Sequence, residues 1–240
     1  MFIMLSKCIY HFLHALLYSI SKILFRYKAS GSEHIPKKGS AILASNHSSY
    51  LDPPFVGMGV PRRINYLAKK ELFSNFFLDC TLKNICGAIP VDREQLDRNT
   101  LKKIYQLLND NEIILMFPEG TRSFNGSFLE PKLGIGMIAY ATRAPVIPVY
   151  VHGSKDILGR DSTRIHFKPC AVFFGPPVDL DSYYSQKKSK ELYQEISMKI
   201  MEGIRKLKES VTHQDRENSR QCSLINRTSH DRNRQLTTGK

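Results

Sequence analysis

The feature that most constrains the fold is Ile113 to Phe117, a short run in which every residue is apolar. A strand with one face in water alternates polar and apolar residues, whereas a strand covered on both faces is apolar throughout, as in mainly parallel sheets. Ala41 to Ala44 and Pro145 to Val151 have a similar character. Because helical patterns separate these runs, the sequence predicts an α/β fold, a mainly parallel sheet flanked by helices.

Periodicity and turn residues set the bounds of the other expected elements. Strands are expected at 40–45, 64–68, 85–91, 113–117 and 145–151, with one or two more in 165–174. Helices are expected at 53–60, 69–84, 96–110, 132–143 and 182–208. One domain, residues 28–208, accounts for all of them. Residues 209–240 contain few apolar side chains, so they are predicted to be a disordered polar tail.

Residues 1–27 are rich in large apolar side chains, yet their longest uncharged run, Cys8 to Ser21, falls short of the ~20 residues that span a bilayer. Polar residues recur there at spacings of three and four: Lys7, His11, His14, Tyr18 and Lys22. A polar stripe beside a broad apolar face predicts a helix lying in the membrane interface. A signal peptide and an apolar helix packed on the domain are the alternatives.

The chain of 240 residues has a formal net charge of +13 and a pI near 9.5. Such a charge favours an anionic partner, which is a nucleic acid, a membrane surface or a phosphorylated substrate. No aromatic and basic ribbon or recognition helix supports nucleic-acid binding. The cysteines, odd in number and without a C-x-x-C pair, indicate neither a disulfide framework nor a metal site and favour a reducing compartment.

A polar stretch, Asn46 to Asp52, follows the first apolar run. On one helix His47 and Asp52 would point roughly 140° apart, so they meet only if His47 leaves a strand and Asp52 begins a helix. Asp52 is a good N-cap residue and Pro53 suits the first helical position, which leaves the carboxylate partly free. A carboxylate beside an imidazole makes a general base for an alcohol. The alternative is that His47 bonds a loop carbonyl and Asp52 only caps.

Arg93 and the segment Glu119 to Arg122 also follow apolar runs directly. Since the carboxyl ends of parallel strands meet at one edge of a sheet, these residues are expected to share a cleft with His47. The two arginines would offer bidentate donors to a phosphate, and Gly120 would let backbone N–H groups approach it. Glu119 would orient an arginine or bond a substrate hydroxyl, with a structural ion pair as the alternative.

In order and spacing these segments resemble the motifs of the glycerolipid acyltransferase family, over residues 30–180. The four matching segments are Asn46 to Asp52 (the His-x4-Asp motif), Gly87 to Arg93, Phe117 to Ser123 and Val146 to Tyr150. Lys132 and Gly134 match a Lys-x-Gly pattern of the family. Pro131 departs from it, because the family commonly has an aromatic residue there, and this leaves one wall of the site undefined.

The resemblance implies the glycerolipid acyltransferase fold and transfer of an acyl chain from an acyl thioester to the sn-2 hydroxyl of lysophosphatidic acid, giving phosphatidic acid for phospholipid biosynthesis. His47 would be the base and Asp52 would hold the imidazolium. Arg93 and Arg122 would bind the phosphate. Glu119, Gly120 and Thr121 would shape that pocket, and Pro148 would line the acyl side.

The resemblance further implies no cofactor or metal beyond the thioester co-substrate, acyl-CoA or acyl carrier protein. It implies a membrane-associated protein at the cytoplasmic face of the cell membrane, with no nucleic-acid partner. One alternative is the same chemistry on glycerol 3-phosphate, another lysophospholipid or an aminoacyl lipid. The other is a non-catalytic peripheral membrane protein that binds acidic lipids.

Overall fold

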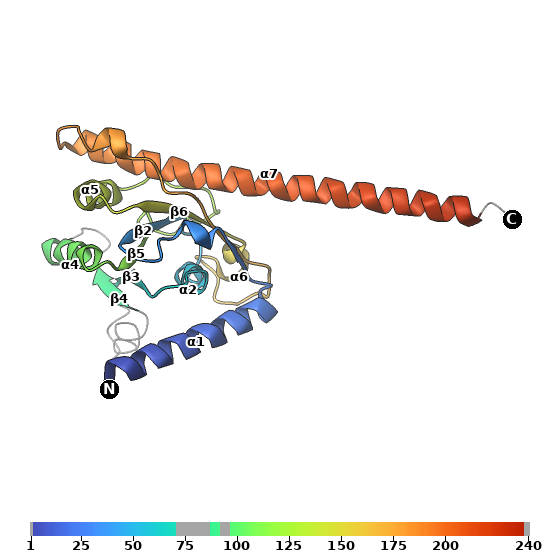
Figure 1. Cartoon of the computed structure of the whole chain (residues 1–240), viewed down its shortest axis with the longest axis horizontal. Helices are drawn as coiled ribbons and strands as arrows, with labels where there is room; N and C mark the ends of the chain where they lie inside the picture. Colours follow the sequence, from blue (N-terminus) through green and yellow to red (C-terminus); the bar gives the residue numbers. More distant parts are fainter. Residues whose placement is uncertain (1, 71–86, 92–96, 238–240) are drawn as a thin grey trace.

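The computed structural model describes residues 2–70, 87–91 and 97–237 (Figure 1). The described residues form a seven-stranded sheet in the order β1-β7-β6-β2-β5-β3-β4. Only β6 and β7 pair antiparallel, and the other neighbouring pairs are parallel. The strands are β1 Lys28–Ser30, β2 Ala41–Ser45, β3 Ile64–Lys69, β4 Ala88–Val91, β5 Ile113–Met116, β6 Val146–His152 and β7 Ala171–Phe174. The predicted mainly parallel sheet is therefore confirmed.

Helices cover both faces of this sheet (Figure 1). They are α1 Phe2–Leu24, α2 Asp52–Met58, α4 Arg98–Asn109, α5 Leu133–Thr142, α6 Ser154–Leu158 and α7 Lys190–Thr237, with short 3-10 helices η1 Ser32–His34 and η3 Asp181–Tyr183. One apolar core lies between the sheet and α2 and α6. The second lies between the sheet and α4, α5 and α7.

The central strands explain why their sequences are apolar throughout. In β2 and β5, Leu43 and Leu115 point into the first core, whereas Ile42 and Ile114 point into the second. All four side chains are fully buried. Successive side chains of a strand alternate between its faces, so a strand between two cores needs apolar residues at every position.

The structure differs from the sequence prediction at several short elements. Strand β1, exposed along its length, and helix α6 were not predicted. In the range 165–174, where one or two strands were predicted, the structure has one, β7, and residues 165–170 form a loop. The helix predicted for 69–84 falls almost wholly within 71–86, outside the described residues. Short exposed elements such as β1 carry no hydrophobic pattern of their own and depend on their neighbours.

Helix α7 also differs from the prediction, because it continues to Thr237 where a disordered tail was expected from residue 209 (Figure 1). No glycine or proline occurs between residues 204 and 238 to end it. Its first half is anchored by buried apolar side chains, the last of which is Val211. The structure therefore continues the helix past its anchored part, and the disorder expected from composition stays a prediction.

Helix α1 contacts the domain through its polar side. His14 Nε2 donates to the carbonyl of Gly57 at 3.2 Å, and Tyr18 packs edge-on against Tyr27. Six of the described apolar side chains of α1 are exposed: Phe12, Leu16, Leu17, Ile20, Ile23 and Leu24. Among the described residues no helix is long and apolar enough to cross a membrane.

Candidate active site

The site begins where β2 ends. The Asn46 side chain donates to the carbonyl of Val151 at 3.1 Å and accepts from the N–H of Val151 at 2.8 Å. These bonds extend the pairing of β2 with β6 past the last ladder residues, Ser45 and Val149. Asn46 therefore sets the point at which the chain leaves the sheet and His47 enters the loop.

His47 is held at its backbone and at its ring. Its N–H donates to Glu119 Oε1 at 3.1 Å, and its carbonyl accepts from the N–H of Ser123 at 2.8 Å. The imidazole stacks on Phe117, with ring centroids 3.9 Å apart and an angle of 18° between the planes. Nδ1 lies 2.9 Å from Asp52 Oδ2. The predicted meeting of a strand-end histidine with a helix-start aspartate is present in the structure.

Asp52 is fully buried, and hydrogen bonds occupy its carboxylate. Besides His47, Oδ2 accepts from the N–H groups of Ser48 and Ser49 at 2.7 and 2.8 Å, and Oδ1 accepts from Ser154 Oγ. The expectation of a capping and partly free carboxylate is therefore wrong, since Asp52 is the first residue of α2 and Leu51 holds the N-cap position. The two prolines that follow offer no N–H, so the carboxylate turns back toward the loop.

This network defines the protonation of the ring. The backbone N–H groups at Asp52 can only donate, so Oδ2 is an acceptor and His47 Nδ1 carries the shared proton. In a neutral imidazole the basic nitrogen is then Nε2. The buried carboxylate stabilises the imidazolium that forms when Nε2 takes a proton.

Ser154 was not predicted from the sequence. It is the first residue of α6, directly after Gly153, whose φ of 82° turns the chain back toward the site. Ser154 is fully buried, and its hydroxyl also lies 3.4 Å from Ser48 Oγ. One sequence signal pointed to it, because it follows an apolar strand as His47 and Glu119 do.

Glu119 braces the loop that follows β5. It is buried, with Oε1 on the N–H of His47 and Oε2 on the N–H of Leu129 at 2.9 Å. Burial raises the pKa of Glu119, and the two backbone donors act against that rise. Since both oxygens accept from the backbone, Glu119 holds two chain segments together, and among the described residues no arginine forms an ion pair with it.

Gly120 lies at the turn of this loop with a φ of 68°, a region that side chains disfavour. A Cβ at this position would lie 2.8 Å from the side chain of Lys132. Its N–H bonds the carbonyl of Phe117 at 3.0 Å. Thr121 follows it and is half-buried.

Among the described residues, Arg122 has a buried side-chain donor that lacks a hydrogen-bond acceptor. Its guanidinium carbon lies 3.3 Å from the ring centroid of Tyr50. Its Nη1 is buried and has no hydrogen-bond partner among the described residues. The carbonyl of Arg122 accepts from Arg160 Nη1 at 2.8 Å, which fixes this part of the loop. Because buried donors are almost always satisfied, the Nη1 group indicates a site for an anionic acceptor.

Two predicted site residues, Arg93 and Pro148, are not part of this network among the described residues. Arg93 is outside the described residues. Pro148 is in β6 opposite Ala44, and its ring lies beside Gly175 and Gly203 of α7. It therefore packs under α7, and its role on the acyl side stays a prediction.

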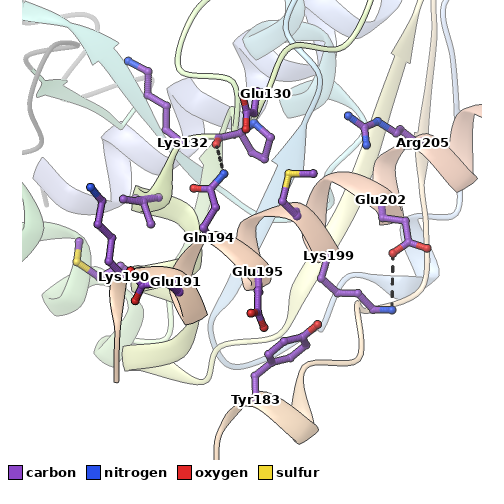
Figure 2. A pocket seen from close by; sticks show the side chains of 15 residues that line it. Glu130, Lys132, Tyr183, Lys190, Glu191, Gln194, Glu195, Lys199, Glu202 and Arg205 are labelled. Carbon is purple, nitrogen blue, oxygen red and sulfur yellow. Dashed lines mark hydrogen bonds and ion pairs between the residues drawn. The ribbon is translucent and has the colours of Figure 1, made fainter. Parts of the chain in front are cut away.

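A groove of about 1490 Å³ runs between the start of α5 and the first half of α7 (Figure 2). It begins at Glu130, Pro131 and Lys132, and the side chain of Lys132 also contacts Gly120. At this end of the groove Gln194 of α7 donates to the Pro131 carbonyl at 3.2 Å. Four basic and four acidic residues line the groove: Lys132, Lys190, Lys199, Arg205, Glu130, Glu191, Glu195 and Glu202. Neither His47 nor Asp52 lines it, and its balanced charges give no preference for an anion.

The described residues contain no group of three or more histidine, cysteine, aspartate or glutamate side chains able to hold a metal ion. The geometry is that of an α/β protein with a buried histidine–aspartate pair at the carboxyl edge of its sheet. A sequence model of the Acyltransferase family matches residues 26–152. This match covers more than half of the chain, and the protein belongs to the acyltransferase family.

Relatives with curated names agree with this assignment. The chain is 37% identical over 127 residues to the 1-acyl-sn-glycerol-3-phosphate acyltransferase of Bacillus subtilis, covering 52% of this chain and 62% of the relative. It is 30% identical over 158 residues to the human 1-acyl-sn-glycerol-3-phosphate acyltransferase alpha, covering 64% and 55%. The match thus spans little more than half the length of these relatives.

The fold has a counterpart among solved structures. The crystal structure of the 1-acyl-sn-glycerophosphate (LPA) acyltransferase PlsC from Thermotoga maritima aligns with a TM-score of 0.66 at 24% identity. The alignment covers 84% of this chain and 82% of that chain. The predicted acyltransferase fold is therefore confirmed.

Proposed function

We propose that this protein transfers an acyl chain from an acyl thioester to the sn-2 hydroxyl of lysophosphatidic acid and so makes phosphatidic acid for phospholipid biosynthesis. The observation that carries the proposal is the His47–Asp52 pair beside Arg122, whose buried Nη1 lacks an acceptor among the described residues. A base for an alcohol next to a site for an anion fits an acceptor with both a hydroxyl and a phosphate. The names of the relatives support the same acceptor.

In the proposed reaction His47 Nε2 takes the proton of the acceptor hydroxyl as its oxygen attacks the thioester carbonyl carbon. The tetrahedral intermediate collapses, the carbon–sulfur bond breaks and an ester remains. The leaving thiolate takes the proton back from Nε2. Four donors hold the Asp52 carboxylate in place beside the ring, where it stabilises the imidazolium.

The phosphate of the acceptor binds at Arg122 in this proposal. Tyr50 stacks on one face of the guanidinium and holds the group in place, so its edge is available to two phosphate oxygens. Gly120 lets the backbone come close to the phosphate. Thr121 lies between Gly120 and Arg122 in the chain, and Glu119 keeps this loop against His47. Arg93 is proposed as the second phosphate ligand on the basis of the family pattern alone.

The acyl thioester is the only co-substrate that this chemistry needs, and no metal or other cofactor takes part in the proposed steps. Thioesters of coenzyme A and of acyl carrier protein both supply the same reactive carbonyl. Pro148 is proposed to influence the acyl side through the packing of β6 against α7.

Membrane association is part of the proposal, at the cytoplasmic face of the cell membrane. Helix α1 presents apolar side chains to the outside, with Phe12 69% and Ile23 79% exposed, while its polar side contacts the domain. An amphipathic helix with this orientation inserts its apolar face into a lipid interface. The net charge of +13 favours a negatively charged membrane.

The test is thiol release from an acyl thioester by the full chain in detergent micelles, with and without lysophosphatidic acid. Release that depends on the acceptor and is lost in His47→Ala supports the proposal, and His34→Ala in η1 is the matched control that should keep it. Release that needs glycerol 3-phosphate or another lysolipid instead moves the proposal to that acceptor. No release with any acceptor, from a folded protein that binds acidic vesicles, favours a non-catalytic lipid-binding role.

A further inference from the structure

The segment Thr163 to Lys168, here called the 163–168 loop, has an unusual surface. Every residue in it is exposed, including two large apolar side chains, Ile165 at 53% and Phe167 at 67%. Three basic or titratable side chains alternate with them: Arg164, His166 and Lys168. Exposed apolar residues among basic ones mark a contact surface when they form a continuous patch.

The loop is fastened to the domain and to the end of α1. The N–H of His166 donates to the carbonyl of Ile157 at 2.9 Å, and the N–H of Cys170 donates to the carbonyl of Phe25 at 2.9 Å. The ring of Phe167 stacks on Phe25, with centroids 6.0 Å apart and an angle of 27° between the planes. Phe167 therefore adjoins the chain directly after α1, close in sequence to the exposed Ile23.

Basic residues accompany both parts of this surface in the sequence. Lys22, Arg26 and Lys28 are exposed at the end of α1 and just after it. Between Gly159 and Cys170 the chain has one acidic residue, Asp161, and three basic residues, Arg160, Arg164 and Lys168. Such a surface, apolar at its centre and positive at its margin, is complementary to a bilayer with anionic headgroups.

We propose that the 163–168 loop is a second membrane-contacting element, which inserts Ile165 and Phe167 into an anionic bilayer beside the end of α1. This inference rests on the membrane association in the proposed function and extends it from one helix to a two-part surface. Because α1 is already held on the domain by His14 and Tyr18, contact at both elements fixes the orientation of the domain on the membrane.

The chain contains no tryptophan, so Phe167→Trp provides a single fluorescent reporter in the full-length protein. With vesicles of phosphatidylglycerol and phosphatidylcholine, its emission should shift to the blue, and brominated lipids should quench it. Met198→Trp is the matched control, because Met198 is exposed on α7 in the groove and should show neither effect. A Phe167→Trp protein that sediments with the vesicles yet shows no shift and no quenching would overturn the proposal.

Substitutions give a second measurement. Ile165→Ser with Phe167→Ser should weaken vesicle binding about tenfold or more, because two exposed apolar side chains no longer insert. Arg164→Gln with Lys168→Gln should weaken binding to anionic vesicles about tenfold or more at low salt, with no change on neutral vesicles. Lys187→Gln with Lys188→Gln removes two exposed charges before α7 and should leave binding unchanged.

Activity in micelles separates this inference from the proposed function. The loop variants should keep thiol release with micellar lysophosphatidic acid and lose it only on vesicles. If no variant and no wild-type protein releases thiol, the acyltransferase proposal fails while the vesicle data still test the loop. If vesicle binding of the loop variants equals that of the wild type, the loop proposal fails whatever the activity.

Discussion

Asp52→Asn isolates the charge of the buried carboxylate, because an amide has the same shape. The amide introduced by this substitution can keep its oxygen on the N–H groups of Ser48 and Ser49, and its NH₂ can donate to Ser154 Oγ. The variant is therefore expected to fold, with a loss of about 1–2 kcal/mol from weaker hydrogen bonds to a neutral acceptor.

The effect on the rate is expected to be far larger. At the 2.9 Å between His47 Nδ1 and Asp52 Oδ2, two unit charges at an effective dielectric constant of about 20 attract each other by about 6 kcal/mol. If the imidazolium forms fully in the transition state, loss of this attraction lowers kcat by about 10⁴-fold. The expected change is in kcat, with the KM for lysophosphatidic acid nearly constant.

The assay is acceptor-dependent thiol release, with circular dichroism melting of both proteins as the check on folding. A folded Asp52→Asn protein whose kcat stays within about tenfold of the wild type would refute the reasoning. In that case His47 does not become positively charged in the rate-limiting step, or another group takes the proton.

Three further predictions follow from contacts in the site. Ser154→Ala leaves Asp52 Oδ1 without its hydroxyl donor; kcat should fall about tenfold and the pH profile of kcat/KM should shift, with rescue by Ser154→Thr. An unchanged profile would make Ser154 merely structural. Arg122→Lys should raise the KM for lysophosphatidic acid about tenfold with kcat nearly constant, because an ammonium cannot replace the planar, bidentate guanidinium; equal KM values would remove Arg122 from the phosphate site. Burial raises the pKa of Glu119 above 4.5, so the folded state binds this proton more tightly than the unfolded state, and the contribution to stability increases as the pH falls from the raised pKa to 4.5. Urea unfolding of Glu119→Gln should lack this pH-dependent part, and identical pH slopes for both proteins would contradict it.

The sequence was informative wherever one segment carries its own pattern. Runs without polar residues predicted the central strands, since burial on both faces demands apolar side chains at every position. The spacing of His47 and Asp52 required a strand end followed by a helix start, and the structure has both. The placement of several polar loops at one sheet edge followed from parallel strand direction alone.

The sequence was much less informative about the partners of each hydrogen bond. It predicted that Asp52 caps its helix and that Glu119 serves an arginine or a substrate, yet both carboxylates bond backbone N–H groups of the loops. A carboxylate can accept hydrogen bonds from a backbone N–H, a side chain or a substrate, and the sequence does not distinguish these donors. The donor that is used is the one that the fold brings within about 3 Å.

By itself, the sequence predicted the α/β class, the edge of the sheet at which the candidate site lies and, as one of two interpretations, the pairing of His47 with Asp52. Only the tertiary structure decided how that pair is held. Ser154 lies 102 positions after Asp52, and Val151 lies 105 positions after Asn46. Such contacts arise because β2 and β6 are neighbours in the sheet, and local patterns carry no record of a partner that distant. The burial that makes these polar contacts strong is likewise a property of the packed domain and not of any single segment.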